Sequence, residues 1–423
     1  MQITRKTLLS LYETAVTAVH PTRCLPSYIP SPIKGRTLVV AAGKASVQMA
    51  EVFANAYKGP FEGLLISHYS PDPTLSVLSQ FEQITASHPI PNAAGQSAAI
   101  RALELATSLK EGDRLIVLLS GGASALLPAP CQGISLEDKI KLTQQLLACG
   151  ASIQEINTVR QHCSEIKGGR LASQAAPAEV LTLAISDVVG DDPVYIASGP
   201  THHTLTPKNS VEKILNNYQI SLPSAVRDAI LEREISHSKN VNTHYSLIAS
   251  ARVALNAVEE QLRQLGYTIH NLGYDLKGDA IETATEHANL ITYHIAKKKV
   301  NLREGNLRKP IAFISGGELT AILGPATGRG GPNTEYLLSL YSQLSINNPY
   351  YALACDTDGK DGTGEAGALL TPDLVETIKT QKLNASQYIK HKDSYTFFDE
   401  IDGLVITGPT DTNVNDIRII LVH

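Results

Sequence analysis

The sequence lacks the cysteine pattern of a disulfide-stabilised or zinc-binding protein. Its five cysteines are an odd number, are widely spaced and include no CxxC pair. A chain of 423 residues buries enough apolar surface to fold without cross-links. We therefore expect reduced thiols in a cytoplasmic protein, with no cysteine metal ligands. The five are Cys24, Cys131, Cys149, Cys163 and Cys355.

Long apolar runs are also missing. No segment reaches the about 18 uninterrupted apolar residues of a membrane-spanning helix. Glu13 interrupts the apolar part of residues 1–20, which favours an amphipathic first helix over a signal peptide. The sequence therefore predicts no membrane association.

An excess of positive charge is absent too. The formal net charge is −5, the pI is about 6.2, and Lys and Arg are dispersed along the chain. This pattern disfavours a nucleic-acid groove or a basic membrane-binding face. Small diffusible ligands are the expected partners, and the sequence leaves a homodimer open.

Apolar segments rich in Val, Ile and Leu do occur, and they alternate with segments of helical periodicity. This pattern is typical of buried parallel strands joined by helices. Strands are expected at 36–42, 63–68, 114–120, 180–186, 310–315, 351–356 and 404–407. The polar segment 231–245 indicates a domain boundary. We predict an α/β fold with a larger N-terminal Rossmann-like doubly wound domain, residues 1–235, and a smaller C-terminal α/β domain, residues 240–423.

Several well-known catalytic and nucleotide-binding motifs are incomplete. The segment AAGKAS contains Gly-Lys after an expected strand but does not complete a P-loop. Leu38 stands where a P-loop needs its first Gly, and Ala45 stands where it needs its hydroxyl residue. Leu126 stands where GxSxG needs its last Gly, so Ser124 is not expected to be an elbow nucleophile. The chain has no HExxH motif and no GxGxxG after its first strand, which disfavours metalloprotease and dinucleotide-binding functions.

Two apolar strands are expected to end in Ser-Gly-Gly, at 120–122 and 315–317. Ligands of open α/β sheets gather beyond the carboxyl ends of the strands. Glycines let backbone amides approach an anion, and a helix starting near Ser124 would add partial positive charge. Phosphate or carboxylate suits such a site, although tight strand-to-helix packing is the structural alternative. The predicted residues are Ser120, Gly121, Gly122, Ser124, Ser315, Gly316 and Gly317.

Charged residues follow the same strands. Asp187 and Asp191 come directly after strand 180–186, where carboxylates can hold Mg²⁺ or accept a proton, or simply form a turn. Arg160 and Lys167 are seven residues apart and share a face if the segment is helical, so they could bind an anionic substrate or be solvated. Lys44 follows the first strand, where it would point toward a bound phosphate, and is the leading catalytic candidate.

The second half of the chain supplies a complementary set of polar residues. Glu318, Arg329 and Asn333 lie near an expected helix start at Pro332, and Asp358 lies in a glycine-rich loop. Anion-binding loops, carboxylates and a few cations are the groups that phosphoryl transfer requires, because the protein mainly positions the reactants and neutralises charge.

These motifs resemble those of the MOFRL-type glycerate 2-kinases, in similar order and over nearly the whole chain. The matching segments are AAGKA, SHPIPNAAG, LLSGGASALL, NTVRQHCSEIKGGRLA, ISDVVGDDPVYIASGPT, SGGE, GRGGPNTE, DTDGKDGTGEAGA and TGPTDTNVND. The resemblance implies transfer of the ATP γ-phosphoryl group to the 2-hydroxyl of D-glycerate, with Mg²⁺ or another divalent cation, in a cleft between the two domains. Lys44 matches the family's lysine. The family's GGRN pattern would place an arginine where this chain has Pro332, so Arg329 takes that role or the role is lost.

Following the resemblance, we assign each candidate residue an expected role. The catalytic candidates are Lys44, Arg329 and Asp187; the nucleotide contacts are the two Ser-Gly-Gly segments with Ser124 and Asn333; the glycerate contacts are Arg160, Lys167 and Glu318; and the metal ligands are Asp187, Asp191 and Asp358. Two other functions stay open: an NAD(P)H-dependent hydroxypyruvate reductase, and a non-catalytic regulator that binds a nucleotide or a sugar phosphate.

Overall fold

The computed structural model describes residues 4–203, 208–232, 241–301, 309–321, 328–344 and 349–423. The chain divides into two units, which are described separately. The Rossmann-like unit is Pro21–Ile248, and the C-terminal unit is Met1–His20 together with Ala249–His423. No helix in the described part of the chain is long and apolar enough to cross a membrane.

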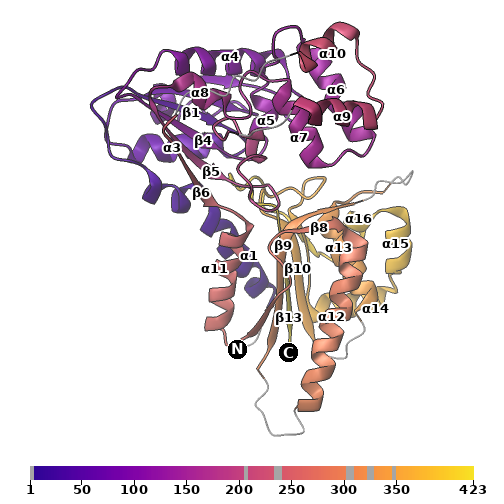
Figure 1. The fold of residues 1–423 in the computed structure, drawn as a ribbon. Helices are drawn as coiled ribbons and strands as arrows, with labels where there is room; N and C mark the ends of the chain where they lie inside the picture. The colour runs from indigo at the N-terminus through magenta and orange to yellow at the C-terminus, as the bar shows by residue number, and fades with distance from the viewer. Residues whose placement is uncertain (1–3, 204–207, 233–240, 302–308, 322–327, 345–348) are drawn as a thin grey trace. The chain divides into compact units, whose positions relative to one another are not determined.

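The Rossmann-like unit is built on a six-stranded sheet with the order β3-β2-β1-β4-β5-β6 (Figure 1). This order is that of a doubly wound dinucleotide-binding fold, so the predicted fold class is confirmed. Ala42 of β1 pairs with Ile66 of β2 and with Leu119 of β4, and all three strands run parallel. Their carboxyl ends therefore lie level at one edge of the sheet. The strands are β1 (Thr37–Ala42), β2 (Glu62–Ser67), β3 (Phe81–Thr85), β4 (Arg114–Leu119), β5 (Glu179–Ile185) and β6 (Thr243–Ala249).

Helices cover both faces of this sheet, as the apolar strand sequences require. Helices α4 (Ala93–Thr107) and α8 (Arg170–Ala175) pack on one face, and α3 (Ser46–Ala56) packs on the other (Figure 1). Beside the sheet, four helices close a small apolar core of their own around Leu146, Val159 and Ile230. These are α6 (Leu136–Ala148), α7 (Ile153–His162), α9 (Lys208–Asn217) and α10 (Ser224–Leu231).

The C-terminal unit contains a mixed sheet with the order β12-β11-β10-β13-β9-β7, and β8 pairs with β9 off this path. Strand β13 pairs antiparallel with β9 and β10, β10 pairs antiparallel with β11, and β11 pairs antiparallel with β12. Strands β7 and β8 run parallel to β9. The strands are β7 (Thr268–Asn271), β8 (Leu276–Asp279), β9 (Ile311–Thr320), β10 (Tyr350–Asp356), β11 (Gly367–Leu370), β12 (Leu404–Val405) and β13 (Asp416–Val422).

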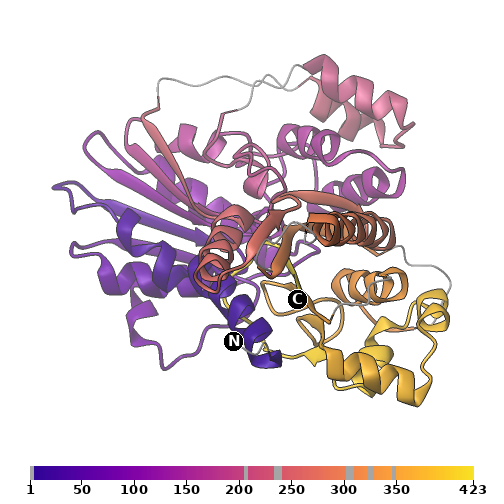
Figure 2. The ribbon, with the colours of Figure 1, turned by 90° about the horizontal axis from the view of Figure 1, so that it is seen from below.

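Two helix pairs enclose this second sheet. Helices α1 (Arg5–Val19) and α11 (Ala251–Gln264) lie on one side, and α12 (Ala280–Asn301) and α13 (Pro332–Gln343) lie on the other (Figures 1 and 2). Three shorter helices follow along the chain: α14 (Pro372–Gln381), α15 (Ala385–His391) and α16 (Ser394–Glu400). The sheet is therefore covered on both faces, and β13 is buried along its whole length.

The compact units differ from the expected domains 1–235 and 240–423 at two elements. Helix α1 belongs to the C-terminal unit, where the Tyr12 hydroxyl donates to the Asp356 carbonyl at 2.8 Å and Thr412 Oγ1 donates to the Val19 carbonyl at 2.8 Å. Strand β6 extends the Rossmann-like sheet, since Val180 N–H donates to the Asn242 carbonyl at 2.9 Å. Residues 233–240, which make up most of the predicted boundary segment 231–245, lie outside the described residues.

The second Ser-Gly-Gly segment does not end a strand, so that prediction is wrong. Ser315, Gly316 and Gly317 lie inside β9, where they pair with Arg418, Ile417 and Asp416 of β13. Gly317 has φ of +109°, and an added Cβ would lie 2.2 Å from the carbonyl oxygen of Leu276. Gly317 therefore lets the β8 backbone approach β9 closely.

We predict that Gly317→Ala destabilises the protein more than Gly278→Ala does. Both glycines have positive φ, so each substitution adds about 1–3 kcal/mol of backbone strain. Gly278 has open space where a Cβ would stand, whereas Gly317 faces the β8 backbone. The overpacking adds about 1–3 kcal/mol for Gly317→Ala alone. Denaturant unfolding of both variants measures the difference, and equal losses would contradict the close approach described here.

Candidate active site

The ends of β1 and β4 form one hydrogen-bonded corner. Ser120 N–H donates to the Ala42 carbonyl at 3.1 Å, and Lys44 N–H donates to the Gly121 carbonyl at 2.7 Å. The Ser120 hydroxyl in turn accepts from Ala45 N–H at 3.0 Å. In the 3-2-1-4-5-6 strand order, β1 and β4 flank the point where the direction of strand succession reverses, which is where ligands of such sheets bind.

Glycines allow three side chains to lie against this corner. A Cβ added at Gly121 would stand 1.8 Å from Oδ2 of Asp187. A Cβ added at Gly122, which has φ of +81°, would stand 2.9 Å from the His88 ring and 3.4 Å from Cγ of Lys44. The side chains of Lys44, His88 and Asp187 therefore all reach the turn at 120–122. Each of the three is half-buried.

The corner unites five predicted residues: Lys44, Ser120, Gly121, Gly122 and Asp187. Sequence reasoning missed His88, although its segment SHPIPNAAG was among the matching motifs. The expected helix after the turn is only the single turn α5 (Ala123–Leu126), so its dipole adds little charge. Within the described residues the N–H groups of Gly121 and Gly122 donate to no protein acceptor, which leaves them available to an anion.

Ser124 is held by the side chain of Lys167. Lys167 Nζ donates to the Ser124 carbonyl at 3.0 Å, to its hydroxyl at 2.9 Å, and to the Ala197 carbonyl at 3.3 Å. Ala197 and Ser198 have φ of 52° and 60°, which are strained values for residues with a side chain. Burial lowers the pKa of Lys167 well below its ordinary value, and the nearby Lys139 and Arg160 charges lower it further.

The expected shared helix face of Arg160 and Lys167 is wrong. Helix α7 ends at His162, and Lys167 lies in the turn before α8. The two cations are nevertheless close enough for Arg160 to lower the pKa of Lys167. Asp191 lies further along the loop after β5 and adopts φ of 56°, with its N–H donating to the Val188 carbonyl at 3.0 Å.

In the C-terminal unit, Asn333 is buried inside a carboxylate network. Its side-chain amide donates to Asp361 Oδ1 at 3.0 Å and to Asp416 Oδ1 at 2.6 Å. Asp361 also accepts the N–H groups of Asn333 and Thr334, so it caps the start of α13. Asp416 pairs with Arg418, which is fully buried in β13 and which sequence reasoning missed. Asn333 thus holds two carboxylates together.

Burial raises the pKa of Asp361 and Asp416 in this network and of the nearby Asp356. The pKa of Asp361 rises to about 8, mainly through burial and with a smaller contribution from the Asp416 charge. Burial also raises the pKa of Asp416, although Arg418 and the hydrogen bond from Asn333 oppose the shift. For Asp356, burial and the charges of Asp416 and Asp358 raise the pKa well above its usual range. The network therefore carries less negative charge at neutral pH than its composition suggests.

The remaining predicted residues of this unit lie nearer the surface. Glu318 is exposed near the end of β9, and Asp358 is half-buried, with Oδ1 accepting Lys360 N–H at 2.9 Å. Arg329 is exposed, and its guanidinium lies 4.0 Å from the centroid of the Tyr395 ring. Pro332 is the first residue of α13. An arginine at that position would start the helix beside Asn333.

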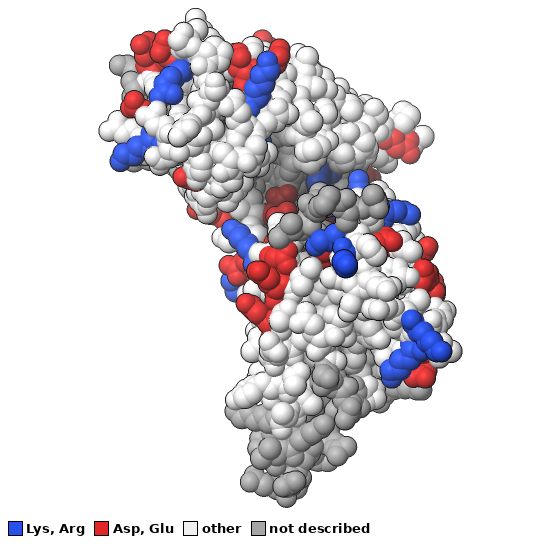
Figure 3. All heavy atoms as spheres, turned by 90° about the vertical axis from the view of Figure 1, so that its right-hand side faces the viewer, with Lys and Arg blue, Asp and Glu red and all other residues white. Residues whose placement is uncertain are grey.

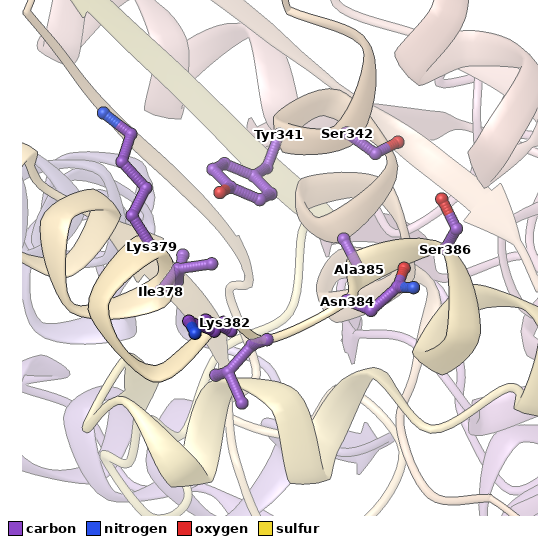
Figure 4. A pocket seen from close by; sticks show the side chains of 9 residues that line it. Tyr341, Ser342, Ile378, Lys379, Lys382, Asn384, Ala385 and Ser386 are labelled. Carbon is purple, nitrogen blue, oxygen red and sulfur yellow. The ribbon is translucent and has the colours of Figure 1, made fainter.

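A separate hollow of about 420 Å³ lies on the C-terminal unit (Figure 4). Tyr341 on α13, Lys379 on α14 and Ser386 on α15 are among its lining residues. None of the predicted site residues lines it. On the face drawn in Figure 3, acidic and basic side chains are interspersed, with no broad area of Lys and Arg among the described residues.

The described residues contain no group of three or more His, Cys, Asp or Glu side chains that could hold a metal ion. Mg²⁺ in nucleotide sites is bound by one or two carboxylates together with phosphate oxygens and water. Asp187 fits this smaller requirement, because its oxygens lie at the Gly121 turn and are hard donors. Asp191 is the other predicted carboxylate of the same loop, whereas Asp358 belongs to the C-terminal unit.

Two family models match the chain. Residues 7–231 match a domain of unknown function, DUF4147, and residues 311–416 match the MOFRL family. The first match covers the described elements from α1 to α10, which include the corner at Lys44 and Ser120. The second spans β9 through the first residue of β13, which include Asn333 and Asp361.

Several named proteins are similar over most of the chain. A D-glycerate 2-kinase from Thermotoga maritima is 34% identical and covers 99% of this chain and 98% of its own. A putative hydroxypyruvate reductase from Agrobacterium vitis is 38% identical and covers 99% and 94%. The crystal structure of a glycerate kinase from Thermotoga maritima superposes with a TM-score of 0.86 at 34% identity, covering 99% of both chains.

We predict that Asp361→Asn destabilises the protein more at pH 5 than at pH 8.5. The wild-type carboxyl has a folded-state pKa of about 8 against 3.8 unfolded, so its contribution to the free energy of unfolding is largest at low pH. That contribution is lost as the pH rises through 8, because the folded carboxyl must ionise while buried. Asparagine cannot ionise and does not follow this trend.

Urea unfolding at several pH values measures the effect. We expect a penalty of about 1–3 kcal/mol at pH 5, from the lost acceptor at Thr334, that shrinks by at least about 1 kcal/mol by pH 8.5. Asp373→Asn, at an exposed site on α14, is the control and should show no such trend. A penalty that grows with pH would contradict the raised pKa.

Proposed function

We propose that this chain, which belongs to the family of MOFRL-type glycerate 2-kinases, transfers the γ-phosphoryl group of ATP to the 2-hydroxyl of D-glycerate. The products are 2-phosphoglycerate and ADP. The observation that supports this most is the corner at the ends of β1 and β4, where Lys44 and Asp187 both reach the glycine turn at 120–122. Such a corner offers a cation, backbone donors and a carboxylate to one anionic ligand.

Lys44 supplies the positive charge in this proposal. Its backbone is fixed by the hydrogen bond to Gly121, so its side chain starts from a defined point over Gly122. A lysine ammonium is a compact point charge that suits the β- and γ-phosphate oxygens. Charge builds on those oxygens as the phosphoryl group leaves, and Lys44 stabilises that charge without moving.

The turn itself supplies backbone donors. The N–H groups of Gly121 and Gly122 have no protein acceptor within the described structure, and neither residue has a Cβ that would keep a phosphate away. Ser120 is fully buried and holds the turn against β1 through Ala45. The donors are therefore oriented before a ligand binds, which lowers the reorganisation cost of catalysis.

Asp187 has two roles open to it in this proposal. Its carboxylate can accept the proton of the attacking 2-hydroxyl, or it can hold a divalent cation with the nucleotide phosphates, with Asp191 as the second carboxylate. A bound Mg²⁺ would neutralise charge on the β- and γ-phosphates. Arg160 and Lys167 are the proposed contacts for the substrate carboxylate, and Arg329 remains the candidate for a second phosphate cation.

The reaction itself is tested by measuring ADP release from ATP with a panel of hydroxy acids and Mg²⁺, followed by identification of the phosphorylated hydroxyl. D-glycerate should give ADP and 2-phosphoglycerate. The relative from Agrobacterium vitis carries the name of a hydroxypyruvate reductase, so NAD(P)H oxidation with hydroxypyruvate is measured in parallel. Oxidation of NAD(P)H without ADP release would overturn the kinase proposal.

We predict that Lys44→Ala lowers kcat by about 10³-fold or more, because a phosphate-directed cation contributes on that scale to phosphoryl transfer. Circular dichroism and the Tm should stay near wild type, since the variant keeps the backbone hydrogen bond from residue 44 to the Gly121 carbonyl. Lys58→Ala, at an exposed lysine of the same unit, should leave kcat unchanged. Near-normal turnover by Lys44→Ala would remove this residue from the mechanism.

We predict that Gly121→Ala lowers kcat about 10²-fold while the fold is kept. Gly121 does not have a positive φ, so alanine is tolerated by the backbone, but its methyl group forces the Asp187 carboxylate to move. Displacements of about 1 Å at a reacting group cost activity on this scale. Gly364→Ala is the control, because a Cβ there meets open space. Full activity of Gly121→Ala would show that catalysis does not depend on the position of the Asp187 carboxylate.

A further inference from the structure

Three cations gather in the Rossmann-like unit beside the candidate active site. They are Lys139 on α6, Arg160 on α7 and Lys167 in the turn after α7. Lys139 is 5% exposed and Lys167 is 1% exposed, whereas Arg160 reaches the surface in part. Each lysine is near enough to Arg160 for its pKa to be lowered by that charge. Burying like charges together is unfavourable unless something balances them.

No carboxylate in the described residues balances this cluster. Among the described residues Lys139 Nζ has no hydrogen-bond partner, and the groups that raise its pKa are the thiols of Cys163 and Cys131. The three partners of Lys167 Nζ are neutral oxygens. For Arg160, burial lowers the pKa and no carboxylate opposes it. The cluster therefore has the composition of an anion-binding site.

The cluster adjoins the glycine corner through Lys167. Lys167 Nζ contacts Ser124, which is two residues beyond Gly122, and Gly122 lies against Lys44. The same lysine and Gln161 hold the strained turn at Ala197 and Ser198. Such strain costs free energy and persists where the surroundings fix it, as at ligand sites. An anion bound by the three cations would thus lie beside the phosphate-binding corner.

We propose that Lys139, Arg160 and Lys167 form a buried subsite for the carboxylate of the acceptor hydroxy acid, in which Lys139 supplies the cation that the free protein leaves unpaired. The inference rests on the proposed function, because it assigns the binding site for the acceptor of that same reaction. It adds Lys139, a binding residue on a different helix from the predicted contacts. The carboxylate of glycerate and its 2-hydroxyl, the phosphoryl acceptor, are on adjacent carbons, so adjoining parts of one unit would hold both groups.

The proposed subsite predicts that the protein takes up protons when the hydroxy acid binds. The folded-state pKa of Lys139 is about 8, lowered by burial and by Arg160, and raised only by the two thiols. A carboxylate placed beside it favours the ammonium form, so binding near pH 8 takes up a proton. Lys167, which has a more strongly lowered pKa, responds in the same direction. Affinity for the hydroxy acid should therefore rise as the pH falls from 9 to 7.

The test compares Lys139→Met with wild type by calorimetric titration with D-glycerate in the absence of ATP. We expect the Kd for D-glycerate to rise at least tenfold in Lys139→Met. Titrations in two buffers of different ionisation enthalpy should show proton uptake for wild type at pH 8 and a smaller uptake for the variant. Lys141→Met is the matched control, because Lys141 lies on the same helix, is exposed and pairs with Glu137.

Thermal unfolding separates a binding role from a structural one. Methionine places no charge in the buried site, so Lys139→Met should have a Tm equal to or above that of wild type, with the gain largest at pH 7 and smaller toward pH 10. The wild-type lysine is costly because the unfolded side chain binds its proton up to pH 10.5 while the folded one releases it near pH 8. A variant that unfolds or loses Tm would show that Lys139 stabilises the fold and would overturn the inference.

Failure of the inference and failure of the proposed function give different results. If wild type releases ADP with D-glycerate but Lys139→Met binds it normally, the subsite is refuted and the kinase function stands. If wild type binds D-glycerate with dependence on Lys139 and proton uptake but releases no ADP, the subsite stands and the kinase function falls. If wild type neither binds D-glycerate nor releases ADP with it, both are refuted.

Discussion

The close approach of two backbone turns at the ends of β1 and β4 is the constraint on which the candidate site depends. A Cβ at Gly43 would stand 2.2 Å from the Ser120 hydroxyl, so only glycine lets the first turn touch the second. That contact aligns the hydrogen bonds from Lys44 and Ala45 to the second turn. The position of the Lys44 side chain is thus set by the backbone of another strand. A charge fixed in this way does not need to reorganise when a phosphate binds.

The buried charged side chains of the two units differ in whether a carboxylate accompanies the buried cation. In the C-terminal unit, Asp361 and Asp416 are bridged by Asn333, and Arg418 adds a fully buried cation, so each carboxylate has several donors. In the described part of the Rossmann-like unit, the Lys139 ammonium group has no hydrogen-bond acceptor. Arg418 Nε and Nη1 also have no hydrogen-bond partner among the described residues, but Arg418 has a carboxylate beside it. A buried cation without a carboxylate has a cost that a ligand can remove.

The sequence predicted the corner because strand ends are readable from apolar runs and because parallel strands bring their carboxyl ends together. Lys44, Ser120 and Asp187 follow such runs, and they meet. It could not predict that β9 continues through Ser315, since the glycines there look like a turn until β8 and β13 pair with both sides of them. Arg418 was missed because one charged residue in an apolar strand gives no sign that it is buried. Its ion-pair partner Asp416 is on the same strand, and the Tyr336 ring beside it comes from α13. These contacts arise from tertiary pairing, which local patterns do not encode.

Helix α1 has a consequence for how the chain assembles during synthesis. It is synthesised before residues 21–248, yet it packs on α11, β10 and β13, which are made after residue 250. Residues 21–248 form a unit whose internal contacts are complete before those partners exist. The nascent chain therefore closes its middle segment first and carries an unpaired amphipathic helix until its last strand emerges. Truncation at the carboxyl terminus would leave the amino-terminal helix without its binding surface, far from the cut in sequence.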